Sequence, residues 1–277
     1  MQLDELTVVI VTFKSEKKIT QCLDSISPQV KILIIENSDN KNFKSYLEKK
    51  YKNLSCILVG SNKGYSTANN IGLKLVKTKF ALVLNPDAIL DENAIKNFFL
   101  SAKKNEDFWL IGPLDNQDQK INSNNENILE VKNLKGFAIF FHVAKFERKF
   151  FDENFFLYFE EIDLCKRVKK QNGKIYLDSS IKIKHEGASS VNKENKLEIE
   201  KNRNWHWMWS TFYFHKKHKG YLIAFIIILP KLLSALAKTI FYLIIFKKEL
   251  KEIYSCRLSG ILNSLIGNKS WYRPSLD

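Results

Sequence analysis

The sequence predicts an α/β protein with a mostly parallel sheet flanked by helices, followed by a helical extension towards the C-terminus. Apolar runs of strand length alternate with helical patterns, which is typical of strand–helix–strand units. The first run, Leu6 to Thr12, is apolar on both faces, as expected of a central parallel strand. A much longer apolar stretch, Tyr221 to Phe246, follows the last of these units and predicts the extension.

The first hundred residues alternate between expected strands and helices. The strand Lys31 to Ile35 is expected to end at the polar turn Glu36 to Asn40, at the carboxyl edge of the sheet. Doubly wound folds bind ligands at that edge, so this half is typical of a nucleotide-binding domain. Asp91 is the expected cap of a helix that runs to Lys104. The other strands expected here are 56–59 and 80–84, and the other helices are 16–25 and 64–77.

The second half resumes the pattern after a looser segment. The Asn-rich run 122–127 is expected to form a surface loop. In the apolar strand that follows, Gly136 permits the close approach of a ligand or a neighbouring backbone. A later short strand leads directly to His185. The remaining expected elements are a strand at 135–141, a helix at 161–171 ending at the left-handed cap Asn172-Gly173, and short strands near 175 and at 181–184.

Composition narrows the class of protein. A chain of 277 residues with 45% hydrophobic and 27% charged residues is long and apolar enough to fold around a full core. Its net charge of +14 predicts an anionic partner, which could be nucleic acid, a phospholipid surface or a phosphorylated substrate. Because the lysines are spread along the chain, the clustered footprint of a duplex-binding protein is missing, and we expect no nucleic-acid partner.

Cysteine spacing and the first residues predict the compartment. Cys22, Cys56, Cys165 and Cys256 form no Cys-x-x-Cys pair, so neither a disulfide framework nor a zinc site is expected. The chain enters its first strand without a basic segment followed by an apolar one, so we expect no signal peptide. Both observations favour a cytoplasmic protein.

An aromatic segment, Phe155 to Phe159, runs straight into three carboxylates, Glu160, Glu161 and Asp163. Aromatic side chains form a low-dielectric pocket that raises the pKa of a carboxyl group, and neighbouring like charges raise it further. A carboxylate tuned in this way can act as a general base. The alternative is an ordinary amphipathic helix start, because acidic side chains are favourable at the positive end of the helix dipole.

A second candidate site combines Asn85-Pro-Asp87 with His185. Pro86 makes a rigid turn after an apolar strand, which places the carboxylate of Asp87 at the edge of the sheet. Mg²⁺ and Mn²⁺ prefer oxygen ligands and use one or two carboxylates together with substrate phosphates. Asp87 and His185 could therefore form a metal and diphosphate site. Taken separately, Asp87 is also explained as a helix cap and His185 as a surface or core histidine.

Together these motifs resemble the nucleotide-sugar glycosyltransferases of family 2, which have the GT-A fold, and among them the rhamnosyltransferase-like members. The resemblance covers about Leu6 to Ser190 and keeps the order of the motifs. Glu36 stands where the family has the Asp of Asp-Asn-x-Ser, Asn85 stands for the first acid of Asp-x-Asp, and Glu161 replaces Asp in the acceptor-side Glu-Asp pair. The matching segments are 8–13, 34–38, 62–72, 84–87, 151–164 and 185–189.

The resemblance implies a role for each matching residue. Glu161 is implied as the catalytic base, and Asp87 and His185 as ligands of Mg²⁺ or Mn²⁺. The implied acceptor-side residues are Gly136, Tyr158, Glu160 and Asp163. The implied donor-binding residues are Thr12, Phe13, Glu36, Asn37, Asn62, Gly64, Tyr65, Asn69, Asn70, Asn85 and Asp87.

The resemblance also implies a Rossmann-like GT-A domain over residues 1–220 and an inverting, metal-dependent transfer of a hexose. The implied donor is a dTDP- or UDP-linked sugar such as rhamnose, and the implied acceptor is a lipid-linked or polysaccharide glycan of a bacterial surface. Two alternatives stay open. A nucleotidyltransferase of related fold would need a Gly-rich phosphate loop, and Thr12 to Glu16 contains no glycine. A non-catalytic basic membrane scaffold would use its acidic residues only as helix caps.

Residues 221–277 are expected to form a separate helical region that associates with a membrane. Aromatic and basic side chains beside an apolar segment are typical of a membrane interface. Here three tryptophans precede the basic run 215–219, and the apolar stretch begins directly afterwards. As a continuous helix, this stretch exceeds the roughly 20 residues needed to span a bilayer.

Two features of this stretch argue against a simple membrane span. Pro230 interrupts it, and Lys231, Ser234, Lys238 and Tyr242 recur at helical spacing as a polar stripe. A lysine at the bilayer centre costs about 2.5–3.5 kcal/mol on insertion scales. We therefore expect one or two helices lying in the cytoplasmic interface, as in a peripheral protein on the inner face of the cell membrane. A buried appendage or an oligomer contact is the alternative.

Overall fold

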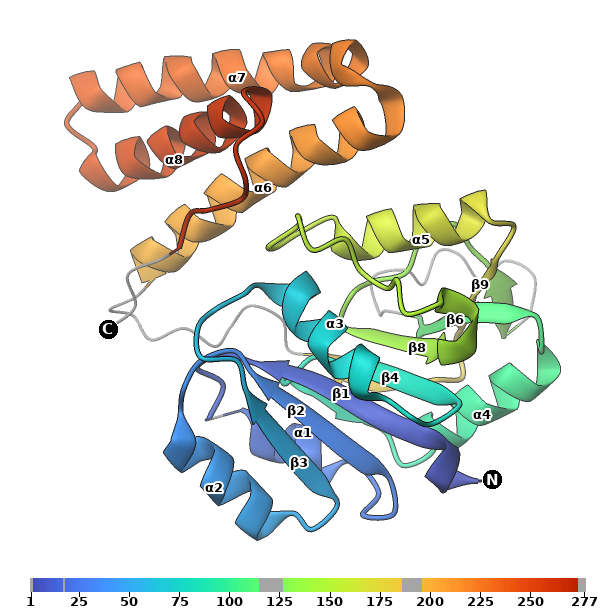
Figure 1. Cartoon of the computed structure of the whole chain (residues 1–277). Coiled ribbons are helices and arrows are strands. Elements are labelled where there is room, and N and C mark those ends of the chain that lie inside the picture. The colour runs from blue at the N-terminus through green and yellow to red at the C-terminus, as the bar shows by residue number, and fades with distance from the viewer. Residues whose placement is uncertain (1, 17, 115–126, 186–195, 274–277) are drawn as a thin grey trace. The chain divides into compact units, whose positions relative to one another are not determined.

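The computed structural model describes residues 2–16, 18–114, 127–185 and 196–273, which belong to two compact units (Figure 1). One unit comprises Met1–Glu153 and Glu160–Ser189, and the other comprises Asn154–Phe159 and Ser190–Asp277. The chain therefore enters the second unit for a short segment and returns immediately before Glu160. Most of the expected Asn-rich loop, 122–126, and the residues that follow His185 in its motif lie outside the described residues.

The first unit is built on an eight-stranded mixed sheet in the order β3-β2-β1-β4-β8-β6-β9-β7. The strands are β1 (Leu6–Thr12), β2 (Lys31–Glu36), β3 (Leu54–Leu58), β4 (Phe80–Leu84), β6 (Phe108–Pro113), β7 (Ile128–Glu130), β8 (Ala138–His142) and β9 (Lys174–Asp178). β1 pairs in parallel with β2 and β4, and β2 with β3. β8 is antiparallel to β4 and β6, β6 is parallel to β9, and β7 is antiparallel to β9. The predicted mostly parallel α/β sheet is confirmed.

Helices cover both faces of this sheet because its central strands are apolar on both sides. Successive residues of a strand point to opposite faces, so Val8 and Ile10 join one core and Val9 joins the other. The first core includes side chains of α1 (Ile19–Asp24), α2 (Lys41–Lys50) and α4 (Ala94–Lys104). The second includes side chains of α3 (Tyr65–Leu75) and α5 (Glu160–Lys170). The parallel strands end at one edge, where the polar residues that follow them gather.

A separate two-stranded antiparallel sheet lies beside the end of β4. β5 (Ala88–Leu90) follows Asp87 directly and pairs with β10 (Ile183–His185), with His185 opposite Ala88. This short ladder fixes His185 next to the turn that contains Asp87. The sequence predicted the later strand but not its partner, because three residues are too few to show a period.

Some local predictions are confirmed and others are wrong. Asn172 has a φ of 57°, which confirms the left-handed cap after α5. Asp91 does not cap α4, which begins further along the chain; instead, its Oδ1 accepts a hydrogen bond from the backbone N–H of Asn93 at 3.1 Å. α2 was not predicted, because only Phe43 and Leu47 are buried along this Lys-rich helix and the apolar period is weak.

The second unit contains three helices, α6 (Lys196–Lys219), α7 (Tyr221–Ile244) and α8 (Lys248–Leu265). Met208 and Phe212 of α6 share one core with Ala224 and Ile228 of α7 and with Ile261 of α8. α6 therefore packs with α7 and α8, whereas the sequence assigned it to the domain 1–220. The predicted division of the chain into a catalytic domain, 1–220, and a helical region, 221–277, stays a prediction.

Candidate active site

A closed hydrogen-bond network joins the ends of β1 and β2. Thr12 Oγ1 donates to Glu36 Oε2 at 2.5 Å, and the hydroxyl of Ser38 donates to Glu36 Oε1. Thr12 and Glu36 are almost completely buried, whereas the neighbouring Phe13 is partly exposed. Burial raises the pKa of Glu36, and the two hydroxyl donors oppose that shift. The protein itself thus holds both carboxylate oxygens of Glu36.

Asn37 ties the end of β2 to the loop before α3. Its Nδ2 donates to Asn62 Oδ1 at 3.0 Å and to the carbonyl of Gly64 at 3.3 Å. Its Oδ1 accepts from the backbone N–H of Lys63 at 2.8 Å. Gly64 precedes α3 with a φ of 83°, a left-handed conformation that favours glycine. Three residues predicted to bind the donor therefore lie together at this edge.

α3 presents Tyr65 and Asn69 on its first turns. The hydroxyl of Tyr65 donates to the carbonyl of Gly136 at 2.6 Å. Burial raises the pKa of Tyr65 well above its usual value, and the charges of Glu160 and Glu161 add to the shift. Asn69 Nδ2 donates to the carbonyl of Tyr65, but its buried Oδ1 has no hydrogen-bond partner among the described residues. α3 therefore connects the donor edge with the acidic start of α5.

Asp87 and His185 lie in direct contact. His185 Nε2 is 3.3 Å from Asp87 Oδ1, and the two side chains are 26% and 16% exposed. Burial acts to raise the pKa of Asp87, but the hydrogen bond and the charge of His185 outweigh it, so that the pKa is lowered. The ring of His185 stacks on Phe137, with centroids 4.7 Å and planes 9° apart. The backbone N–H of Asn85 donates to the carbonyl of Phe137 at 2.8 Å, which holds the turn against the same residue.

The Asp87–His185 pair can offer a carboxylate oxygen and an imidazole nitrogen to a divalent cation. No group of three or more His, Cys, Asp or Glu side chains gathers at a possible metal position in the part of the chain that the structure describes. Two protein ligands suit Mg²⁺ or Mn²⁺ when substrate phosphates and water complete the shell. A structural zinc site would need four. The residues present therefore fit a cation held jointly with a diphosphate.

Glu160 and Glu161, the first two residues of α5, lie in different environments. Glu160 is 5% exposed, and its Oε2 has no hydrogen-bond partner within the described ranges. Burial raises the pKa of Glu160 well above its usual value, and the charge of Glu161 adds to the shift. Burial also raises the pKa of Glu161, while backbone N–H groups at the helix start oppose that shift. Glu161 is partly exposed, so it is the more accessible residue of the pair.

Gly136 and Phe137 link the acidic pair to the Asp87–His185 pair. A Cβ built on Gly136 would lie 3.7 Å from the Cβ, Cγ and Cδ of Glu161. The next residue, Phe137, stacks on His185. Because consecutive Cα atoms are about 3.8 Å apart, the predicted base and the predicted metal ligands border one short segment. The structure thus brings together two groups that the sequence offered as separate candidate sites.

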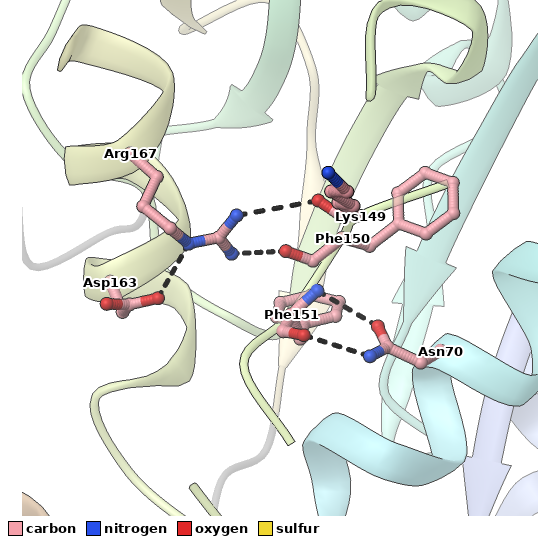
Figure 2. A network of polar contacts seen from close by, with 6 residues as sticks. All are labelled: Asn70, Lys149, Phe150, Phe151, Asp163 and Arg167. Atoms are coloured by element: carbon pink, nitrogen blue, oxygen red, sulfur yellow. Dashed lines mark hydrogen bonds and ion pairs between the residues drawn. The ribbon is translucent and has the colours of Figure 1, made fainter. Parts of the chain in front are cut away.

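Asp163 belongs to a network that holds the segment before α5 (Figure 2). It is fully buried, and its Oδ2 accepts from Arg167 Nε at 2.8 Å. The same guanidinium donates to the carbonyls of the two residues before Phe151. Asn70 of α3 bonds to the N–H and the carbonyl of Phe151, each at 2.9 Å. Figure 2 shows both clamps on this segment, so Asp163 and Asn70 have structural contacts, and their roles in ligand binding stay predictions.

Tyr158, predicted on the acceptor side, lies in the short segment that belongs to the helical unit. Tyr158 and Phe159 have φ values of 71° and 72°, a left-handed conformation that costs non-glycine residues about 1–3 kcal/mol each. Trp207 packs against both rings, with centroids 5.2 and 5.3 Å away, and Phe214 packs against Phe159 at 5.2 Å. Aromatic packing within the helical unit therefore holds the strained residues that lead into α5.

Sequence reasoning missed roles for Ser38, Phe137 and Arg167. Arg167 follows Asp163 by four residues, a spacing at which opposite charges meet on a helix, so that signal could have found it. Ser38 lies within a matching segment, but its bond to Glu36 depends on the turn after β2. Phe137 has no local signal, because its contact with His185 joins segments far apart in the chain.

A cavity of about 670 Å³ lies elsewhere in the first unit. Its lining includes Lys79 and Phe80 at the start of β4 and Phe108 at the start of β6. The candidate site lies instead where the parallel strands end, and it shares no residue with this cavity. The cavity therefore plays no part in the assignment of the site.

The mixed α/β sheet, with polar residues at the ends of its parallel strands, has the architecture of the GT-A fold. The chain belongs to glycosyl transferase family 2: the sequence profile of that family matches residues 7–165, more than half of the chain.

Individual relatives agree with this assignment. The chain is 24% identical over 197 residues to the low-salt glycan biosynthesis hexosyltransferase Agl10 of Haloferax volcanii. The aligned residues cover 61% of this chain and 63% of that protein. It spans less than two thirds of the length of each sequence relative that it matches here.

Two solved structures show the same fold. The mannosyltransferase PcManGT of Pyrobaculum calidifontis, in complex with GDP-Man and Mn²⁺, superposes with a TM-score of 0.56 at 12% identity, over 94% of this chain and 87% of that one. Residues 1–349 of S. aureus TarS superpose with a TM-score of 0.51 at 15% identity, over 97% and 93% of the two chains. At these identities the similarity establishes the fold alone.

Proposed function

We propose that this chain is an inverting, metal-dependent glycosyltransferase that moves a hexose from a nucleotide-diphosphate donor to a hydroxyl group of a lipid-linked or polysaccharide acceptor. The observation that supports this most directly is the segment Gly136–Phe137, which borders Glu161 through one residue and His185 through the next. A base and a diphosphate-binding pair beside one segment are what a single displacement at a sugar carbon requires. Membership of the family supplies the reaction class.

Glu161 takes the proton of the acceptor hydroxyl in this reaction. As the O–H bond breaks, the acceptor oxygen forms a bond to the anomeric carbon of the donor sugar. The bond between that carbon and the diphosphate oxygen breaks on the opposite face, and its electron pair leaves with the diphosphate, so the configuration inverts. The raised pKa of Glu161 makes this carboxylate a better proton acceptor than an exposed one.

Asp87 and His185 would hold Mg²⁺ or Mn²⁺ together with the diphosphate end of the donor. The bound cation would supply positive charge against the negative charge that develops on the leaving diphosphate. The hydrogen bond and charge of His185 lower the pKa of Asp87, which favours its charged form. Stacking on Phe137 fixes the ring plane of His185 and so directs its Nε2 towards Asp87.

The edge formed by Thr12, Phe13, Glu36 and Asn37 receives the nucleotide, with Phe13 as the exposed surface for the base. Resemblance to rhamnosyltransferase-like members favours a dTDP- or UDP-linked rhamnose as the donor. We place the reaction in bacterial surface glycan synthesis, at the inner face of the cell membrane, where a lipid-linked acceptor is accessible. The relative Agl10 is a hexosyltransferase of glycan biosynthesis, which supports a role in glycan synthesis.

A donor panel tests the proposed function. The chain is incubated with dTDP-, UDP- and GDP-linked sugars in Mg²⁺, Mn²⁺ or EDTA, with and without a membrane lipid extract as acceptor, and released nucleoside diphosphate is measured. We expect release from one donor, stimulation by the extract and no release in EDTA. Full activity in EDTA would remove Asp87 and His185 from their role. Pyrophosphate release from a nucleoside triphosphate and a sugar phosphate would support a nucleotidyltransferase, and failure to bind any donor would support a scaffold.

A further inference from the structure

We infer that the helical unit docks on an anionic lipid surface through one uncharged face of α7, with the helix axis in the plane of the membrane. This inference deepens the membrane location included in the proposed function. Because lipid binding can be measured without catalysis, an experiment can contradict the docking inference without contradicting the proposed function, and the reverse.

The outer face of α7 is apolar along the whole helix. α7 has a mean hydropathy of 1.9 and is long enough to cross a membrane. Yet only 17% of its 18-residue apolar stretch is buried in the structure. Its buried residues, Ala224, Ile228 and Ala235, face the other helices. Residues on the opposite face recur at intervals of four and seven, which is the period of one helix face. They are Leu222, Ile226, Leu233, Ile240 and Ile244, and they are 71%, 61%, 57%, 50% and 66% exposed.

The polar stripe of α7 lies away from that face. Lys238 Nζ is 3.3 Å from the hydroxyl of Tyr254 on α8 and 5.0 Å from the centroid of its ring. Tyr242 stacks on the same ring at 5.5 Å. Lys231 precedes Lys238 by seven residues and therefore lies on the same side of the helix. The lysines that argued from the sequence against membrane insertion thus leave an apolar face that carries no charge.

Packing within the helical unit opposes a membrane span. α6 and α8 share a core with α7, so the three helices would enter the bilayer together. α8 contains a series of charged side chains, and each is costly in hydrocarbon. They are Lys248, Glu249, Lys251, Glu252 and Arg257. Contact through the outer face alone buries apolar side chains and leaves these charges in water.

Charges at both ends of α7 favour a lipid surface over a second copy of the chain. Lys216, Lys217 and Lys219 precede the helix, and Lys247, Lys248 and Lys251 follow it and outnumber Glu249 and Glu252 in the same segment. If two copies paired through their outer faces, either orientation would bring basic ends together. An anionic lipid surface attracts both ends at once. Exposed aromatic rings, Tyr221 at the start and Phe241 and Phe246 near the end, are also typical of a membrane interface.

Cosedimentation of the full-length chain with lipid vesicles tests the inference. Vesicles of phosphatidylcholine are compared with equal mixtures of phosphatidylcholine and phosphatidylglycerol, at low and high salt. We expect binding to the mixed vesicles that weakens with salt, and much weaker binding to the neutral ones. Leu233→Glu places a charge at the centre of the outer face and should weaken binding about tenfold or more. Leu100→Glu, on α4 and similarly exposed at 54%, is the matched control and should bind as wild type does.

The charge contribution needs a variant that keeps the apolar face. Lys219→Gln, Lys247→Gln and Lys248→Gln are combined in one chain. Each lysine near an anionic surface contributes about fivefold to binding, so the triple variant should bind mixed vesicles about a hundredfold more weakly. Unchanged affinity in this variant would remove the electrostatic part of the inference.

Three further outcomes decide the matter. A solution dimer that Leu233→Glu dissociates, in a chain that binds no vesicles, would overturn docking in favour of a second copy. Equal binding to neutral and anionic vesicles would overturn the choice of an anionic surface. Resistance to alkaline carbonate extraction from cell membranes would overturn the in-plane arrangement in favour of a span. Circular dichroism and thermal unfolding confirm that each variant is folded. If vesicles bind but no donor is consumed, the proposed function fails and docking stands.

Discussion

The donor edge and the start of α5 differ in how their polar groups are satisfied. At the ends of β1 and β2, Thr12 and Ser38 donate to both oxygens of Glu36, so this buried carboxylate is fully bonded within the protein. At the start of α5, Glu160 is buried and Glu161 is partly exposed, the pKa values of both are raised, and one oxygen of Glu160 has no partner among the described residues. Satisfied networks give a fixed shape, whereas carboxyl groups whose raised pKa is not opposed by side-chain donors are suited to proton transfer. The contrast separates residues that build the site from the residue that reacts.

Replacement of Glu161 tests this contrast with the largest expected effect. Glu161→Gln keeps the size of the side chain and removes the proton acceptor, so kcat should fall about 10²–10⁴-fold while donor affinity and thermal stability change little. Glu36→Gln is the matched variant on the donor edge. It should lose about 1–2 kcal/mol of stability, because one hydroxyl must rotate to accept from the new amide, but keep most of its turnover at saturating donor. Turnover by Glu161→Gln near the wild-type value, in the nucleotide-release assay, would place the base elsewhere.

Asp163 sharpens the contrast, because it neighbours Glu161 in sequence but belongs to a satisfied network. Asp163→Asn keeps the shape and removes the charge that pairs with Arg167, whose other contacts are carbonyl oxygens. We expect a loss of about 2–3 kcal/mol in the free energy of unfolding, measured with urea. Glu130→Gln is the control, since its pairs with Lys169 and Lys174 are exposed and screened by solvent. Equal stability of the two variants would contradict a structural role for Asp163.

Patterns within single elements made much of the sheet predictable. β1 and β4 were recognised because their residues are apolar on both faces, and the left-handed cap at Asn172 because asparagine tolerates that conformation. α2 gave too weak a period to be recognised. Prediction therefore succeeded where one segment contained its own signal.

The residues of the candidate site could be proposed from the sequence, but their contacts could not. Residue type and neighbours singled out Asp87, His185 and the acidic start of α5, and the family resemblance singled out Glu161 within it. Their proximity depends on the three-residue strand β5 and on the contacts of Gly136 and Phe137, which join segments far apart in the chain. No local period encodes such contacts, so they appear only in the folded chain.

Two glycines offer a smaller test of the same contrast. A Cβ on Gly72 of α3 would overlap the Cγ1 of Val9 and lie 3.1 Å from the Cγ1 of Ile35, so Gly72→Ala should cost about 1–3 kcal/mol of stability. A Cβ on Gly136 would lie 3.7 Å from Glu161, an ordinary contact, so Gly136→Ala should leave stability nearly unchanged and raise the KM for the acceptor a few-fold. Urea unfolding and acceptor titration measure the two effects. A destabilised Gly136→Ala would mean that the surroundings of Glu161 are as tightly packed as those of Gly72.

The smallest expected effect concerns Glu160 and depends on pH. Burial, with the charge of Glu161, raises the pKa of Glu160 in the folded chain above its value in the unfolded chain. With such a carboxyl group, the folded state has its full stability only below the pKa that the group has in the unfolded chain. The free energy of unfolding then decreases as the pH rises through the pKa of the folded chain. Glutamine does not titrate and therefore avoids the loss. The melting temperature of Glu160→Gln relative to wild type should accordingly rise from mildly acidic to mildly alkaline pH.

Activity distinguishes this role of Glu160 from that of its neighbour. If the buried Glu160 keeps its proton and leaves Glu161 as the base, Glu160→Gln should retain kcat within a few-fold while Glu161→Gln does not. A loss of kcat in Glu160→Gln as large as in Glu161→Gln, with the fold intact, would mean that the two carboxyl groups share the proton-accepting role. A melting-temperature difference that does not change with pH would mean that Glu160 is as well solvated as an exposed carboxylate, and the contrast between the two regions would then rest on Glu161 alone.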